Sequence, residues 1–119
     1  MKGDAGDFIW ANADFNVLGL GSAEALGEHT AASLARTYNL MLTRHVTTKL
    51  SGLDAREISL ENVSGSGDVN YIRFVVALRS VPNEVGIAYV VGVRGKTNSV
   101  TAAQVFSSVV ESFRTEIVN

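Results

Sequence analysis

Two glycine-rich turns are the first features of this sequence that could do chemistry. Gly95-Lys96-Thr97 follows an apolar run and precedes an amphipathic one, which is where a phosphate-binding loop would stand. That loop needs another glycine five residues before its second one, because backbone N–H groups must wrap the phosphates, and position 90 is Val90. Gly19-Leu20-Gly21 lacks the third glycine of a dinucleotide-binding fingerprint. We therefore expect a strand-to-helix turn at the first site and a hairpin at the second.

Residues for catalysis or metal binding form no recognisable pattern. His29 and His45 are the only histidines, and neither has a carboxylate or a second histidine at ligand spacing, so we expect surface or strand-edge histidines. No Ser/His/Asp order and no general-acid pair stands out among the twelve acidic residues. Because there is no cysteine, disulfides and thiolate metal sites are excluded. The sequence predicts no enzyme, no cofactor and no metal.

Arginine and tyrosine side chains carry the more specific binding chemistry. Tyr71, Arg73 and Arg79 occupy alternate positions of one apolar run, and Tyr89 lies in the next run. On one face of a sheet, arginines can hold phosphates and tyrosines can stack on unpaired bases. An ordinary solvated sheet face, with arginines that serve solubility, explains the same pattern.

Composition indicates a single folded domain. The chain has 119 residues, of which 46% are hydrophobic and 18% charged. No signal peptide is expected behind Lys2, and no run approaches the roughly 20 apolar residues of a membrane span. The net charge of −2 is unevenly distributed, because residues 29–96 carry eight Lys/Arg against five acids. This mildly basic middle permits a polyanionic partner without requiring one.

The elements that would position these side chains begin with an expected hairpin over residues 7–20. Asn12 and Asp14 lie between two apolar groups of this segment and suggest its turn. Residues 22–50 stay open. Alanine and leucine favour a helix to about residue 36, whereas residues 38–48 are rich in types that prefer strands.

Three strands are predicted after this open segment. Ile58 and Leu60 alternate with polar residues from Arg56 onward, which is typical of a half-buried strand. Turn signals at residues 64–68 and 81–84 separate this strand from apolar runs over residues 71–79 and 87–94. We expect the three to form an antiparallel meander.

The last element is predicted to be an amphipathic helix, capped by Asn98 or Ser99. Its apolar residues recur at spacings of three and four and form one stripe. The stripe comprises Ala103, Phe106, Val109, Val110, Phe113 and Ile117. No apolar element follows to cover it. We therefore predict that the helix mediates dimerisation through Ala103, Phe106, Val109, Val110 and Phe113.

The segment from about Arg56 to Asn119 resembles the coat proteins of single-stranded RNA bacteriophages. The matching stretches are REISLENVSGSGDVNYIRFVVALRSVP, GIAYVVGVRG and TNSVTAAQVFSSVVESF, and DFIWANADFNVLGL stands where that family has its N-terminal hairpin. The resemblance implies an α+β fold with an N-terminal β-hairpin, an antiparallel β-sheet meander and a C-terminal α-helix packed on the sheet of a dimer partner. It also implies that residues 38–48 are a strand and that the helical propensity of residues 23–36 is misleading.

The same resemblance implies a function. Homodimers would assemble into an icosahedral capsid that packages genomic RNA and binds an RNA hairpin on the inner face of the sheet. The protein would be made in the bacterial cytoplasm and reside in the virion, with no membrane partner. If Ile72, Phe74, Val76 and Leu78 face the helices, the opposite face carries the RNA contacts. The candidates are Thr47, Lys49, Ser59, Tyr71, Arg73, Arg79 and Tyr89.

A second hypothesis comes from a different class, a small cytoplasmic α+β adaptor or RNA-binding module. If residues 24–48 are one helix, the order becomes helix, three strands, helix, as in double-stranded-RNA-binding domains. Those domains place lysines at the start of the last helix to contact phosphates. Here no lysine follows Lys96. An enzyme of unknown type is the third possibility.

Overall fold

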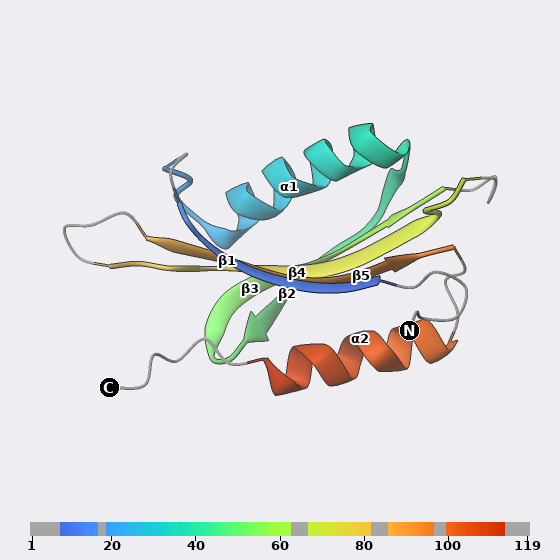
Figure 1. Ribbon diagram of the computed structural model, residues 1–119. Helices are drawn as coiled ribbons and strands as arrows, with labels where there is room; N and C mark the ends of the chain where they lie inside the picture. The colour runs from blue at the N-terminus through green and yellow to red at the C-terminus, as the bar shows by residue number, and fades with distance from the viewer. Residues whose placement is uncertain (1–7, 17–18, 63–66, 82–85, 97–99, 114–119) are drawn as a thin grey trace.

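A five-stranded antiparallel sheet carries one helix on each face (Figure 1). The computed structural model describes residues 8–16, 19–62, 67–81, 86–96 and 100–113. In chain order the elements are β1 (Phe8–Phe15), α1 (Ala23–Tyr38), β2 (Met41–Leu50), β3 (Leu53–Glu61), β4 (Tyr71–Arg79), β5 (Ile87–Gly95) and α2 (Val100–Ser112). The sheet order is β1-β5-β4-β3-β2, so β1 and β2 are the edge strands. The α+β class is confirmed.

The predicted meander is confirmed and is one strand longer than expected. β3, β4 and β5 contain the three predicted strands, and β2 pairs with β3 ahead of them. β1 then pairs with β5 at the other end. In chain order, four strands therefore separate the two helices, which contradicts the helix, three-strand, helix order of the second hypothesis.

Local signals at both ends explain α1. The side chain of Ser22 accepts a hydrogen bond from the backbone N–H of Ala25, which caps the helix start. Asn39 adopts a left-handed conformation with φ 58°, and its N–H donates to the carbonyl of Ala35. The helix that propensity favours to about residue 36 is present and extends to Tyr38, in a segment that the sequence left open. Of the predicted strand over residues 38–48, the part from Met41 onward is extended, whereas Tyr38 ends α1. The inference that this propensity is misleading is wrong.

One side of the sheet is covered by α1. Gly27 brings the helix close to β3, since a Cβ at this position would lie 2.7 Å from Cδ1 of Ile58. Even-numbered residues of β4 face this helix. The buried residues of this α1-side cluster are Leu26, Ala31, Leu40, Ile58, Leu60, Ile72, Phe74 and Val76.

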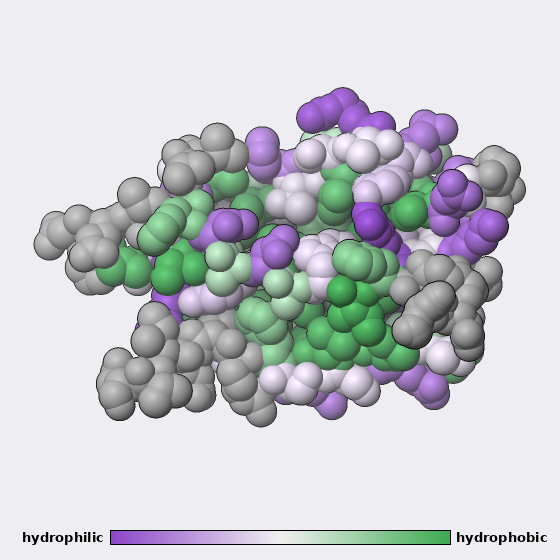
Figure 2. All heavy atoms as spheres, in the orientation of Figure 1, coloured by the Kyte–Doolittle hydropathy of each residue, from purple (hydrophilic) through white to green (hydrophobic). Residues whose placement is uncertain are grey.

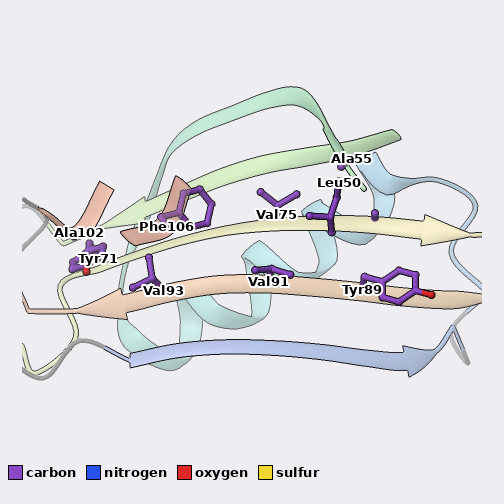
Figure 3. Close-up of a cluster of buried hydrophobic side chains, with 10 residues drawn as sticks. Leu50, Ala55, Tyr71, Val75, Tyr89, Val91, Val93, Ala102 and Phe106 are labelled. Atoms are coloured by element: carbon purple, nitrogen blue, oxygen red, sulfur yellow. The ribbon is translucent and has the colours of Figure 1, made fainter. Parts of the chain in front are cut away.

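The opposite side of the sheet is covered by α2 (Figure 1), and Figure 3 shows its Phe106 and Ala102 side chains against the strands. Odd-numbered residues of β4 face this helix. The buried residues of this α2-side cluster are Leu50, Ala55, Tyr71, Val75, Ala77, Tyr89, Val91, Val93, Ala102 and Phe106. β4 is therefore buried on both faces, as a central strand between two helical layers must be.

The prediction of an N-terminal hairpin is wrong. β1 is a single strand whose residues pair with β5 without interruption from Phe8 opposite Arg94 to Phe15 opposite Ile87. Asn12 and Asp14 therefore sit in the ladder and make no turn. The exposed edge of β5 offers a partner for eight consecutive residues, and this ladder outweighs a weak local turn signal.

The premise that the last helix lacks a cover within its own chain is also wrong. Phe106 is 4% exposed against the chain's own sheet, and Val109, Val110 and Phe113 pack on the same cluster. Ala102 is fully buried, whereas Ala103 is only half-buried. Alternate residues of β4 and β5 supply a second apolar face that receives the stripe. The proposed caps at residues 98 and 99, and Ile117, lie outside the described residues.

Candidate functional site

Five of the seven candidate RNA-binding residues share the face beneath α2. Ser59 pairs with Arg73 across β3 and β4, and Tyr71, Arg79 and Tyr89 fall on the same side by strand alternation. The structure brings these side chains onto one surface, as the sequence predicted. That surface is covered by α2, however, so the expectation of an open face is wrong.

Burial limits what the tyrosines can do. Tyr71 is 0% and Tyr89 5% exposed, and the ring of Tyr89 meets Phe113 edge-on at 6.0 Å between centroids. Ser59 is 5% exposed. Neither tyrosine can stack on a base while α2 occupies this face. Arg73 and Arg79 are half-buried.

The remaining two candidates lie on the opposite face. Thr47 pairs with Arg56, which pairs with Val76 of the α1-side cluster, and Lys49 shares the parity of Thr47. The expectation that they join the arginines is wrong, because a strand turns alternate side chains to opposite faces. The Lys49 ammonium lies 2.5 Å from Asp54 and holds the pKa of that exposed carboxyl below its usual range.

A small notch beside Arg73 interrupts the contact between α2 and the sheet. It has a volume of about 210 Å³ and is lined by Glu57, Arg73, Phe106, Ser107, Val110 and Glu111. Nε of Arg73 is buried and has no hydrogen-bond partner within the part of the chain that the structure describes. Two glutamates line the same notch, so it already holds countercharge for the guanidinium and is a poor anion site.

The histidines fit the sequence prediction. His29 is exposed on α1, and His45 is half-buried on the edge strand β2. Among the described residues, no group of three His, Cys, Asp or Glu side chains is placed to hold a metal ion. Neither described helix is long and apolar enough to cross a bilayer.

A cavity lies on the α1 side, between α1 and strands β1, β4 and β5. Its volume is about 480 Å³, within the usual range for a small-molecule site. It is lined by Phe8, Trp10, Asn12, Thr30, Leu34, Ile72, Val90 and Arg94. We call this the Trp10 cavity. Most of its wall is apolar, with one cation, one amide and one hydroxyl.

The indole that names this cavity depends on a glycine in β5. Trp10 pairs with Gly92, and a Cβ at Gly92 would lie 2.5 Å from Cη2 and 2.7 Å from Cζ2 of the indole. The Cζ2–Cη2 edge of the indole therefore lies against Gly92, where a larger residue would leave no room. Glycine inside a strand is a recognised mark of close approach, and it is the sequence signal that could have pointed here.

The cation of the cavity is held by aromatic rings. The guanidinium of Arg94 lies 4.7 Å from the ring centroid of Phe8 and 5.2 Å from that of Tyr38, and it donates a hydrogen bond to the hydroxyl of Tyr38. No described carboxylate forms an ion pair with it. The charge of Arg94 is thus positioned without being neutralised.

The polar groups of the cavity have unused hydrogen-bonding capacity. The side chains of Asn12 and Thr30 make no hydrogen bond within the described residues. None of the cavity residues was predicted as a site residue from the sequence, because residues 7–20 resemble a local hairpin. A single strand at β1 instead places Phe8, Trp10 and Asn12 on one face, opposite Arg94, Gly92 and Val90.

Comparison with known proteins gives no match among family models, curated proteins or solved structures.

Proposed function

We propose that this chain is a self-assembling structural protein, the coat protein of a single-stranded RNA bacteriophage. In this proposal the chain forms homodimers, the dimers build an icosahedral capsid, and the capsid packages genomic RNA in the virion. The proposal assigns the chain no catalytic role. The observation that supports it best is the open apolar edge formed by β1.

An unpaired strand edge presents backbone N–H and C=O groups that can pair with another chain. In β1 nearly every residue is exposed, including Ile9 at 47% and Phe15 at 71%. Asp14 is the only charged residue of this strand. Figure 2 shows hydrophobic atoms gathered right of and below the centre of this face, between the positions that β1 and α2 take in the view of Figure 1. Such an edge favours association.

The other edge of the sheet carries features that oppose pairing. β2 has an irregular register between Leu42 and Arg44, and its side chains include the charged Arg44 and Lys49. Bulges and charges are the usual protection of an edge strand. The contrast between the two edges favours β1 as the contact, and the proposal takes a second copy of this chain as its occupant.

Antiparallel pairing of β1 with the β1 of a second copy would join two sheets into one. On the α2 side of the sheet, β1 exposes only apolar residues, which are Ile9, Ala11, Ala13 and Phe15. A two-fold axis perpendicular to the sheet would place the α2 sides of both copies on the same face of the joined sheet. The apolar residues of the two β1 strands would then meet along the seam between the copies. This replaces the contact through the α2 stripe, which the chain's own sheet already covers.

RNA packaging stays part of the proposal, with its contacts revised. Arg36, Arg44, Lys49 and Lys96 are exposed and can neutralise phosphates. Arg44 and Lys49 must first leave their ion pairs with Glu57 and Asp54. Tyr71 and Tyr89 could stack on bases only if α2 left the sheet.

Electron microscopy of the protein expressed alone tests the proposal directly. We expect uniform closed shells, with RNA recovered after their disruption. A single small species in light scattering over a wide range of protein concentration would contradict it.

A matched pair of variants tests the β1 seam. Ile9→Lys places a charge on the proposed seam at an exposed site, so the chain should fold and yield monomers. Met41→Lys makes the same change on β2, where Met41 is 64% exposed, and should assemble as the unmodified protein does. Equal loss of assembly in both variants, or in neither, would refute β1 as the contact.

A further inference from the structure

The Trp10 cavity combines features that match one class of ligand. It offers an indole, a cation held by aromatic rings without a described carboxylate partner, and an amide without a hydrogen-bond partner among the described residues. We propose that this cavity binds a nucleotide, with the base on Trp10 and the phosphate on Arg94. The inference rests on the proposed coat function only for the source of that nucleotide, which can be free or an unpaired residue of RNA.

The order of the groups along β1 supports this ligand. Phe8, Trp10 and Asn12 point to the same face, and alternate residues of a strand lie about 7 Å apart. Arg94 pairs with Phe8, so the guanidinium and the amide lie at opposite ends of the row with the indole between them. A nucleotide presents phosphate, sugar and base edge in a line. A compact aromatic carboxylate reaches only one end.

Charge fixes the orientation of the ligand. Asp14 continues the same face two residues beyond Asn12, so that end of the row is negative. The Arg94 end carries the positive charge. The phosphate must therefore lie beside Arg94, and the edge of the base beside Asn12.

The amide of Asn12 suggests which base fits. It offers one donor and one acceptor, the pair that matches the N6 and N7 edge of adenine. The hydroxyl of Thr30 supplies a further donor or acceptor from α1. We expect adenine nucleotides to bind more tightly than pyrimidine nucleotides.

Intrinsic fluorescence provides the assay, because Trp10 is the only tryptophan of the chain. The full-length protein is titrated with adenosine monophosphate, adenosine and benzoate. Saturable quenching by the monophosphate is expected, with about tenfold weaker binding of adenosine because the phosphate–arginine contact is lost. Benzoate should bind more weakly still, because its carboxylate can reach Arg94 but it has no base edge to reach Asn12. Quenching that rises linearly without saturation, or equal binding of benzoate, overturns the proposal.

Two variants assign the roles of the residues. Arg94→Gln removes the positive charge but keeps a polar side chain, and it should weaken binding of the monophosphate about tenfold while leaving adenosine unchanged. Asn12→Ala alters an exposed side chain and should remove the preference for adenine over cytosine. Arg56→Gln, on strand β3 and outside the cavity lining, is the control and should bind as the unmodified protein does. Unchanged binding in both Arg94→Gln and Asn12→Ala refutes the site.

An adenine-rich oligoribonucleotide identifies the source of the nucleotide. If it displaces the monophosphate and its binding weakens in Arg94→Gln, the site takes an unpaired residue of RNA. If the monophosphate binds and the oligonucleotide does not displace it, the site takes a free nucleotide. Particle assembly is scored separately by light scattering without nucleotide, so failure of the coat proposal and failure of this site give different results.

Discussion

Replacing Gly92 with alanine is expected to expel the indole of Trp10 from its place on β5. The new methyl group would lie 2.5 Å from Cη2 of the indole and 2.9 Å from the backbone oxygen of Arg73. Truncation of a buried tryptophan costs about 3–5 kcal/mol, so losing the packing of the half-buried Trp10 should cost about 2 kcal/mol. Alanine also lowers the conformational entropy of the unfolded chain, which offsets about 0.5–1 kcal/mol of this loss. The net destabilisation is about 1–1.5 kcal/mol.

Urea unfolding followed by circular dichroism measures this change at one fixed protein concentration. The free energy of unfolding should fall by the stated amount, and the tryptophan emission should shift to the red because the ring becomes solvated. Gly21→Ala is the matched control, since a Cβ there meets nothing within 4 Å. A Gly92→Ala protein with unchanged stability and emission would refute the packing argument.

A double variant separates the two contacts made by the added methyl group. In a Trp10→Ala background the indole is gone, so Gly92→Ala should cost less than it does in the unmodified chain. Any cost that remains reports the contact with the Arg73 backbone. An undiminished cost would show that the indole is not the obstacle.

Three further predictions follow from packing and charge. Phe106→Ala should lower the free energy of unfolding by about 3 kcal/mol, because the ring packs on the chain's own sheet, and a loss below about 1 kcal/mol in urea unfolding would contradict this. Ser22→Ala should cost about 1 kcal/mol through loss of the cap to Ala25, and an unchanged thermal midpoint would argue against the cap. Lys49→Ala should raise the pKa of Asp54 toward its ordinary value, as measured by NMR titration. Since that pKa is depressed in the folded chain, the small stabilisation is present above the ordinary carboxyl range and is lost as the pH falls through the depressed value.

Much of the secondary structure could be predicted from the sequence. Strands β3, β4 and β5 and helix α2 follow from periodicities of two and about 3.6 residues, which are local properties of the chain. The cap at Ser22 and the alanine-rich segment behind it likewise specify α1. These signals hold because each residue's preference depends on neighbours within one or two turns.

The assignment of faces could not be predicted in the same way. β4 is apolar on both sides, with Ile72 and Phe74 toward α1 but Tyr71 and Val75 toward α2. Alternation shows that two faces exist, not which helix covers each. The prediction that Arg73 lies on an open face was therefore wrong, because α2 covers that face. The RNA contacts predicted there depended on the same assumption.

The sequence by itself determined that the chain forms helices and strands of an α+β domain, with neither a recognisable catalytic motif nor cysteine chemistry. Only the tertiary structure shows that residues 8–15 form a single strand, that this strand pairs with β5, and that Trp10 packs on Gly92. Trp10 and Gly92 are about eighty residues apart in the sequence. Their pairing is stabilised by the whole β1–β5 ladder and by packing of the indole, and neither can be predicted from neighbouring residues. The Trp10 cavity and the open β1 edge both arise from that one long-range contact.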